Sequence, residues 1–310
     1  MTSPEDAKAI CECQLLGLER EGMDAATNPN VVGVGIGRKT VRGVATKDIA
    51  LKVYVKQKIH PLLVRDEQVI PDEVEGVPTD VEEAGEFSIW RPIPPIYQRK
   101  VRPAMGGISI GHYAITAGTL ACLVRDAGET FILSNNHVLA NENRGAEGDP
   151  ILQPGRFDGG KTDRDVIARL DTFVAVDPAG TNLVDSALAK PFDERDVIPD
   201  ILGIGRLRGT KEAVLDEKVM KSGRTTRKTD GTVMDVSATL RVGYQTGSYV
   251  FTDQMIIKGE RGAFSAGGDS GSTIVAYDGN AVGLLFAGSP FFTIANKMSH
   301  VEKALDVQLI

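Results

Sequence analysis

The chain has 310 residues, which at about 150 residues per domain suggests two domains or one large barrel or sandwich. Its 35 Lys and Arg residues against 42 Asp and Glu residues leave a net charge of −7. The molecule therefore repels phosphate and anionic lipid, and we expect no nucleic acid and no membrane as partner. Hydrophobic residues at 42% and charged residues at 25% are typical of globular proteins and exclude disorder and fibrous repeats. The 34 glycines and few aromatic residues favour a turn-rich, β-rich fold.

Three cysteines and the N-terminal sequence indicate a cytoplasmic protein. No apolar run approaches the roughly 18 residues of a membrane span, and the acidic N-terminus differs from a secretory signal. Cys11, Cys13 and Cys122 cannot all form disulfides with one another, which is typical of a reducing compartment. Two thiols without a matching second pair give little support for zinc, so we expect no metal here.

Residues 1–87 predict a small α+β domain. Apolar residues at helical spacing within residues 3–20 indicate one amphipathic helix, and the apolar runs 31–37 and 49–55 indicate strands. This domain would serve recognition, regulation or self-association, which makes a homo-oligomer an expectation. Residues 88–103 contain four prolines and predict an extended linker, because proline cannot pair within a central strand.

Residues 104–310 form a different kind of sequence. Short runs rich in Val, Ile, Thr and Ala alternate with turns that contain glycine, which predicts an all-β barrel or sandwich. The last periodic stretch, residues 298–307, predicts a C-terminal helix.

A glycine-rich loop, residues 267–272, contains a candidate nucleophile. Ser270 lies between glycines just before an apolar strand, and glycine lets the backbone turn sharply and direct its amide hydrogens to one point. In an arbitrary protein the same sequence is more often an ordinary turn. The loop alone therefore does not decide between the two readings.

A serine nucleophile needs a base, and the base needs an acceptor that orients it. Of the four histidines, His137 alone directly follows a predicted strand, although a satisfied structural histidine is the more common case. Asp185 lies in the apolar run 182–189, which predicts a buried strand. A buried carboxylate requires a partner, either a histidine ring or backbone amides.

Together the three residues resemble the catalytic triad of trypsin-like serine proteases, the chymotrypsin-fold family. They follow the order His137, Asp185, Ser270, with gaps of 48 and 85 residues, in the contexts Ser-Asn-Asn-His, Val-Asp-Ser-Ala and Gly-Asp-Ser-Gly. The resemblance covers residues 105–310. The whole chain looks like the intracellular trypsin-like peptidases of bacteria and, more distantly, like the narrow-leaf proteins of plants.

The resemblance implies a mainly β fold, a chymotrypsin-like double β-barrel with a C-terminal helix, preceded by the small α+β domain. It implies that His137 is the general base, Asp185 orients it, and Ser270 attacks the scissile carbonyl, with the backbone amides of Gly268 and Ser270 as oxyanion hole. The expected function is a serine endopeptidase acting on a protein or peptide, with no metal or organic cofactor. The alternative is an inactive protease-like scaffold that binds a partner protein.

The chain departs from this family at three places. No processing site is evident that would create a new N-terminal amine for Asp269, so Asp269 needs another partner, such as a backbone amide or a basic side chain. Phe264 occupies the position expected at the base of the specificity pocket, and Phe286 replaces a small polar residue near Gly288. With these three residues as its lining, the pocket is expected to take small or apolar side chains.

Further charged residues near the triad are given simpler roles. Asp158, Asp163 and Asp165 could bind calcium through their oxygens, but a solvated acidic loop is the preferred interpretation. Lys221 and Arg224 are expected to be surface charges beside a turn.

Overall fold

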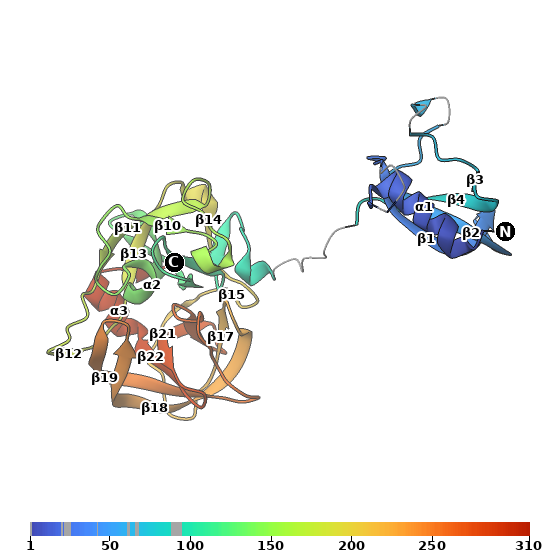
Figure 1. Ribbon diagram of the computed structural model, residues 1–310. Helices are drawn as coiled ribbons and strands as arrows, with labels where there is room; N and C mark the ends of the chain where they lie inside the picture. The colour runs from blue at the N-terminus through green and yellow to red at the C-terminus, as the bar shows by residue number, and fades with distance from the viewer. Residues whose placement is uncertain are drawn as a thin grey trace. The chain divides into compact units, whose positions relative to one another are not determined.

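The computed structural model describes residues 2–19, 21, 26–41, 43–60, 63–65, 68–87 and 95–310. The chain divides into two compact units, Met1–Pro92 and Ile93–Ile310, coloured blue to cyan and green to red in Figure 1. Residues 88–94, the first part of the expected linker, lie outside the described residues.

The first unit is one helix packed against a four-stranded sheet in the order β1-β2-β4-β3. Helix α1 begins after Ser3, whose hydroxyl accepts the amide of Asp6 in a capping box, as expected for a serine at this position. Its buried residues, among them Ala7 and Cys11, join Leu51 and Val53 of β2 in the core of this unit. The elements are α1 (Pro4–Leu16), β1 (Val31–Val41), β2 (Val44–Val55), β3 (Glu73–Val74) and β4 (Val77–Glu83).

Residues 95–103, the second part of the expected linker, contact the second unit. The Lys100 ammonium lies 3.0 Å from Asp165, and the amide of Val101 donates to Gln153 at 3.0 Å. A short 3₁₀ turn, η3 (Ile96–Gln98), precedes these contacts. This stretch is therefore part of the second unit.

The first barrel of the second unit is a sheet in the order β23-β8-β9-β13-β11-β10-β6-β7. Strands β7 and β8 lie in one stretch, residues 118–126, which pairs with β6 through β7 and with β9 through β8. The sheet therefore closes on itself as a barrel. Its strands are β6 (Ser109–His112), β7 (Gly118–Thr119), β8 (Cys122–Asp126), β9 (Glu129–Ser134), β10 (Pro150–Leu152), β11 (Val166–Phe173), β13 (Ala187–Pro191) and β23 (Gln308–Leu309).

The second barrel closes through β22, which pairs with both β19 and β21. The path runs β19-β18-β17-β20-β21 and returns to β19 through β22. Two short strands, β12 and β16, extend this sheet, and β5, β14 and β15 form a separate small sheet. The strands are β5 (Ala104–Gly106), β12 (Thr181–Asn182), β14 (Val197–Ile201), β15 (Gly205–Arg206), β16 (Gly209–Thr210), β17 (Lys218–Gly223), β18 (Arg227–Tyr244), β19 (Gly247–Gly259), β20 (Thr273–Ala276), β21 (Asn280–Gly288) and β22 (Thr293–Lys297).

Apolar clusters fill each barrel and the space between the two. Ile132 belongs to the cluster in the first barrel, and Ile257 belongs to the cluster in the second. A third cluster joins Leu133 and Leu284, one from each barrel, to helix α3 (Met298–Leu305). The predicted mainly β fold, a chymotrypsin-like double barrel with a C-terminal helix, is confirmed.

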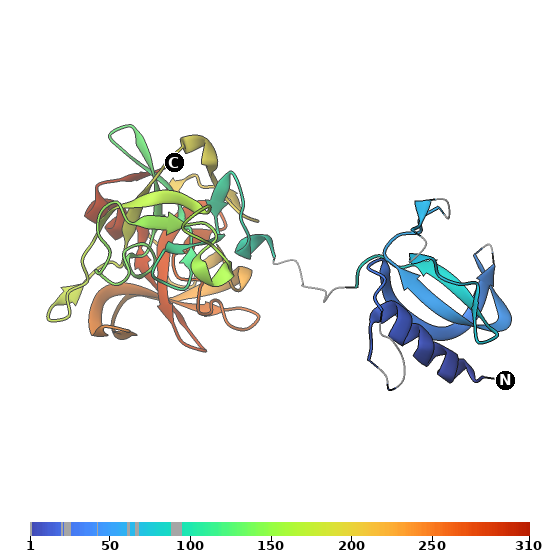
Figure 2. The same cartoon turned by 45° about the horizontal axis from the view of Figure 1, so that its top comes forward.

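Among the residues that the structure describes, the longest hairpin is formed by β18 and β19, with strands of 18 and 13 residues. Figures 1 and 2 show it as a long orange ribbon. Its tip, Tyr244–Gly247, reaches the first barrel, where the amides of Gln245 and Thr246 donate to Glu142. The second barrel thus contributes a strand end to the region around His137. Among the described helices, none has the length and apolar character to cross a bilayer.

Candidate active site

Pairing of β9 with β13 brings the candidate base and its orienting acid together. His137 lies on α2 (Asn136–Leu139), a single helical turn directly after β9. Asp185 lies in the turn just before β13, and not within a strand as expected. Ala187 at the start of β13 pairs with Ser134 at the end of β9, so the residues beyond these two strand ends are neighbours. The side chain of Asn135 fixes the turn by donating to the backbone carbonyl of Asp185 at 2.7 Å.

His137 and Asp185 form a direct hydrogen-bonded pair. The Nδ1 atom of His137 lies 2.6 Å from Oδ2 of Asp185, and the His137 amide donates to Oδ1 at 3.2 Å. Asp185 is completely buried, while the His137 side chain is 21% exposed. Burial disfavours both charges, but the mutual attraction outweighs it, so the pKa of His137 is raised and the pKa of Asp185 is lowered. Asp185 therefore has the histidine partner that its burial demanded.

A third group contacts Asp185, and sequence reasoning missed it. Tyr244, the last residue of β18, donates its hydroxyl to Oδ2 of Asp185 at 2.6 Å. Its ring meets the His137 ring edge-on, with 5.8 Å between centroids. Burial, followed by the Asp185 charge, raises the pKa of Tyr244, so the phenol stays protonated and acts as a donor. No local motif marks this tyrosine, because the contact depends on the length of the hairpin.

Ser270 lies close to the first barrel but does not hydrogen-bond His137 in the part of the chain that the structure describes. Its Oγ donates to the carbonyl of Phe286 at 3.4 Å, and its carbonyl accepts the amide of Thr119 at 2.8 Å. The next residue must be glycine, because a Cβ at Gly271 would lie 2.1 Å from the carbonyl oxygen of Thr119. The absence of a side chain lets the nucleophile loop pack directly on the first barrel.

Asp269 has both kinds of partner that the sequence led us to expect. The Lys221 ammonium lies 3.3 Å from Oδ2, and neither side chain is exposed. Backbone amides of Thr225, Thr226 and Ala266 also donate to its carboxylate, at 2.8, 3.1 and 3.0 Å. The expectation that Lys221 is a surface charge is wrong. A buried carboxylate requires compensation, and β17 supplies it from inside the barrel.

The other charges assigned to the surface are corrected in the same way. Arg224 is 8% exposed and forms a two-point ion pair with Asp158, at 2.6 and 2.7 Å. Asp165 is 4% exposed and pairs with Lys100, whereas Asp163 is exposed. Two of the three aspartates are therefore ion-pair partners in the protein and not members of a solvated loop. Among the described residues no cluster of three or more His, Cys, Asp or Glu side chains could hold a metal.

The loop before Ser270 leaves two amides free for an oxyanion. Within the described residues, the amides of Gly268 and Ser270 donate no hydrogen bond. The neighbouring carbonyls are both held by hydrogen bonds, since Thr225 Oγ1 donates to Gly267 at 2.7 Å and Thr119 Oγ1 donates to Gly268 at 2.9 Å. Gly268 has φ +93°, a conformation that favours glycine. This loop can present two donors to a developing negative charge.

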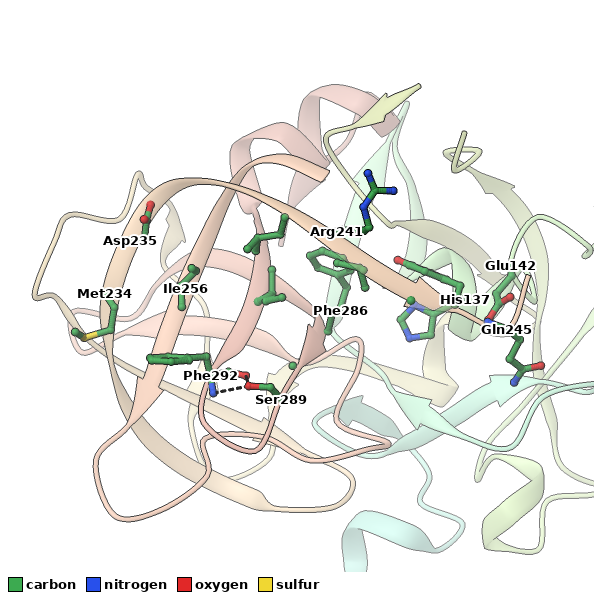
Figure 3. A pocket seen from close by; sticks show the side chains of 17 residues that line it. His137, Glu142, Met234, Asp235, Arg241, Gln245, Ile256, Phe286, Ser289 and Phe292 are labelled. Atoms are coloured by element: carbon green, nitrogen blue, oxygen red, sulfur yellow. Dashed lines mark hydrogen bonds between the residues drawn. The ribbon is translucent and has the colours of Figure 1, made fainter. Parts of the chain in front are cut away.

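A cleft of about 1020 Å³ opens beside His137, and Figure 3 shows His137 at one end and Met234 and Phe292 toward the other. Phe286 and Gly288 line it, as expected for pocket residues. Phe264 does not line it: the side chain is 2% exposed and packs in the core of the second barrel. Its ring fills space that Gly231 leaves, since a Cβ there would lie 2.7 Å from the ring. The lining residues are His137, Glu142, Met234, Asp235, Leu240, Arg241, Val242, Gly243, Tyr244, Gln245, Ile256, Phe286, Ala287, Gly288, Ser289, Phe292 and Ile294.

Two sequence comparisons relate the chain to a plant protein. A family model described as the Nal1 C-terminal domain matches residues 166–296. Protein NARROW LEAF 1 of Oryza sativa subsp. japonica is 27% identical over an alignment of 307 residues, which covers 83% of this chain and 51% of the plant protein. The chain thus spans about half the length of this curated relative. The expected distant resemblance to the narrow-leaf proteins is confirmed.

The chain is also similar to solved structures of proteases. A glutamic-acid-specific serine protease is 20% identical with a TM-score of 0.49, over 67% of this chain and 100% of that one. Thermobifida fusca Protease A is 18% identical with a TM-score of 0.49, over 66% of this chain and 97% of its own. A Cellulomonas bogoriensis chymotrypsin is 17% identical with a TM-score of 0.48, over the same shares. All three are described as proteases, the class of protein that the motifs around His137, Asp185 and Ser270 resemble.

Proposed function

We propose that the second unit is a serine endopeptidase that hydrolyses peptide bonds through an acyl-enzyme. The observation that carries this proposal is the contact of His137 with the buried Asp185, at 2.6 Å between Nδ1 and Oδ2. A histidine held in this way keeps its other ring nitrogen available as a base. The free amides of Gly268 and Ser270 beside the candidate nucleophile support the same reaction.

Each step of the reaction uses a group of this chain. His137 takes the proton of the Ser270 hydroxyl as the oxygen attacks the scissile carbonyl, and the amides of Gly268 and Ser270 stabilise the oxyanion. Protonated His137 then gives its proton to the leaving amine, and the acyl-enzyme forms. Asp185 stays ionised and stabilises the imidazolium. Water then attacks the acyl-enzyme while His137 takes its proton. His137 returns that proton to Ser270, and the carboxylic acid product is released.

Substrate must draw Ser270 toward His137. In the free protein Ser270 Oγ donates to the carbonyl of Phe286 at 3.4 Å, a long and weak hydrogen bond. The proposed reaction requires Ser270 to exchange this acceptor for His137, and catalytic hydrogen bonds often tighten only when substrate is bound. The free geometry is therefore compatible with the proposed reaction.

The proposed substrates have small or apolar side chains at the cleaved bond. Ser265 Oγ hydrogen-bonds Thr293 Oγ1 at 2.6 Å. A Cβ at Gly288 would lie 3.3 Å from the Ser265 hydroxyl. The gap between the end of β21 and the nucleophile loop is therefore narrow. The cleft beyond it is lined mainly by apolar side chains such as Met234 and Ile256, which would hold apolar residues further along the peptide.

The second candidate function is a protease-like scaffold that binds a partner protein without cleaving it. It is favoured by the same Ser270–Phe286 hydrogen bond, which leaves Ser270 unconnected to the base in the free protein. It is also favoured by Phe286, a bulky residue at a place where the family has a small polar one.

Labelling with a fluorophosphonate tests the two candidates, because the reagent reacts with an activated serine whatever the natural substrate. Mass spectrometry should find one adduct, located on Ser270, and none in Ser270→Ala or His137→Ala. Turnover of a sensitive peptide should fall about a millionfold in either variant. Absence of any adduct on the wild-type chain would favour the scaffold instead.

We also propose a reducing, cytoplasmic location and self-association through the first unit. Cys11 and Cys122 are free, buried thiols, which is typical of proteins from reducing compartments. Strand β1 is at the edge of its sheet and exposes Ile36 and Val41, which supports edge-to-edge pairing of two copies. Cell fractionation tests the location, and a monomeric mass by light scattering at working concentration would contradict self-association.

A further inference from the structure

The buried carboxylate of Asp185 receives more donors than a histidine alone provides. Oδ2 is 2.6 Å from His137 Nδ1 and 2.6 Å from the Tyr244 hydroxyl, and Oδ1 accepts the His137 amide at 3.2 Å. Asp185 is completely buried, so water cannot substitute for a missing donor. Each of these hydrogen bonds therefore affects how its charge is shared with His137.

The Tyr244 ring belongs to a cluster of aromatic side chains. Its neighbours in this cluster include Tyr249, Phe251 and Phe286, and the rings of Phe251 and Phe286 have centroids 4.6 Å apart. Phenylalanine offers no side-chain donor, and the Tyr249 hydroxyl contacts Thr246. Within this cluster of described residues, the Tyr244 hydroxyl is the group that hydrogen-bonds Asp185.

We propose that Tyr244 is a positioning residue of the triad, whose hydroxyl holds Asp185 in the orientation that serves His137. This inference rests on the proposed function, because it assigns Tyr244 a role in the same reaction. Tyr244 does not touch the reacting atoms. It acts through Asp185 and, by ring contact, through the orientation of His137.

Two sets of contacts keep the tyrosine in place. Its ring packs edge-on against Tyr249, at 5.1 Å between centroids, and is stacked with Phe251 at 6.0 Å. The next two residues are held by Glu142, whose carboxylate accepts the amides of Gln245 and Thr246 at 3.1 and 3.0 Å. The hairpin tip of the second barrel is thereby attached to the loop that follows His137. The triad carboxylate is thus contacted from both barrels.

Loss of the hydroxyl has a defined electrostatic consequence. The Tyr244 hydroxyl donates to the same oxygen that His137 Nδ1 contacts, and its positive hydrogen partly offsets the negative charge that the imidazolium feels. Without it, Asp185 attracts the imidazolium more strongly, so the pKa of His137 rises. The carboxylate is also less restrained in its plane, so the base is held less well for proton transfer.

The test is Tyr244→Phe, which removes one oxygen and keeps the aromatic packing. Tyr249→Phe is the matched control, because it removes a hydroxyl from the same hairpin that contacts Thr246 and not Asp185. NMR titration of His137 should give a higher pKa in Tyr244→Phe and an unchanged value in Tyr249→Phe. The downfield resonance of the proton between His137 and Asp185 should move only in Tyr244→Phe. We expect kcat to fall roughly 10- to 100-fold with little change in KM.

The NMR readout separates this inference from the proposed function. An unchanged His137 titration and an unchanged downfield resonance in Tyr244→Phe overturn the positioning role, even if the enzyme is active. If the His137 titration shifts in Tyr244→Phe but no fluorophosphonate labels the wild-type chain, the positioning role is supported and the endopeptidase is rejected. If Tyr244→Phe does not fold, 3-fluorotyrosine at position 244 keeps the hydroxyl as a stronger donor. It should shift the His137 pKa downward, and no downward shift would overturn the inference.

Discussion

The Lys221 ammonium lies 3.3 Å from the carboxylate of Asp269 with neither side chain exposed to solvent. Lys221 lies on β17, and Asp269 immediately precedes the candidate nucleophile. A side chain of the barrel thus supplies the basic partner that was expected for Asp269.

Removal of the Lys221 charge should destabilise the protein and slow labelling of Ser270. Lys221→Met leaves Asp269 buried without its counter-ion. Because backbone amides still donate to the carboxylate, we expect a loss no larger than the roughly 3–5 kcal/mol found for buried charges left unpaired. Chemical denaturation measures the loss, and the fluorophosphonate rate reports on the loop. The double variant Lys221→Met with Asp269→Asn is the control, since it removes both charges and should recover part of the stability. Equal stability of Lys221→Met and wild type would contradict a structural role for the pair.

The hydroxyl of Thr225 should matter for the reaction rate because it holds the Gly267 carbonyl away from the oxyanion site. In Thr225→Val this carbonyl is free to turn inward, and we expect kcat to fall about tenfold or more, as for loss of a neutral hydrogen bond or an oxyanion donor. Thr225→Ser keeps the hydroxyl and should retain most of the activity. Steady-state kinetics of the two variants with one peptide decide the matter. Similar rates for Val and Ser would argue against the carbonyl's role.

Activity should increase with pH through a midpoint above the ordinary histidine value of about 6.5. Only neutral His137 can accept the Ser270 proton, and the Asp185 charge raises the pKa of His137 against the opposing effect of burial. The pKa of Asp185 is lowered, so this carboxylate is ionised throughout the range. The pH dependence of kcat/KM measures the midpoint. A midpoint below 6.5 would be inconsistent with the ion pair that the structure contains.

The raised pKa of His137 also affects stability, and this contribution decreases with pH whereas activity increases. Because the folded pKa of His137 lies above the unfolded one, the pair stabilises the fold fully below about pH 6.5. This contribution is lost as pH rises through the folded pKa. Denaturation of wild type and His137→Ala across this range should therefore diverge most at the acidic end.

Glu142 should attach the hairpin tip to the first barrel. Glu142→Ala removes both acceptors of the Gln245 and Thr246 amides, so hydrogen exchange at these two amides should accelerate. Activity should fall as well, because Tyr244 adjoins the tip. Glu147→Ala removes a similar charge from an exposed residue nearby and should leave exchange at the tip unchanged. Unchanged exchange in Glu142→Ala would exclude this attachment.

Peptides with small residues before the cleaved bond should be preferred. The narrow gap between Ser265 and Gly288 leaves little room for a long side chain, and the cleft beyond it is lined mainly by apolar side chains. Profiling with a peptide library should therefore rank alanine and valine above lysine and arginine at this position. A preference for arginine or lysine would mean that the pocket is formed by other residues.

The sequence by itself led to His137, Asp185 and Ser270 as candidate site residues, to an all-β barrel or sandwich and to a C-terminal helix, whereas the double barrel was implied by the resemblance. The features inferred from the residues depend on local patterns: a glycine-rich turn before a strand, an acid in an apolar run, and short strands separated by turns. The resemblance also implied that Asp269 needs a partner, in agreement with the cost of a buried carboxylate that is not compensated. Such inferences succeed because the physical demand is contained in a few neighbouring residues.

Only the tertiary structure decided which groups meet that demand. Lys221 and Arg224 look like surface charges in their polar context, yet closure of the barrel buries both beside carboxylates that are far away in sequence. Tyr244 reaches Asp185 across a long hairpin, and Phe264 fills a space left by a glycine on another strand. The environment of a side chain depends on these long-range packings, which no local spacing contains.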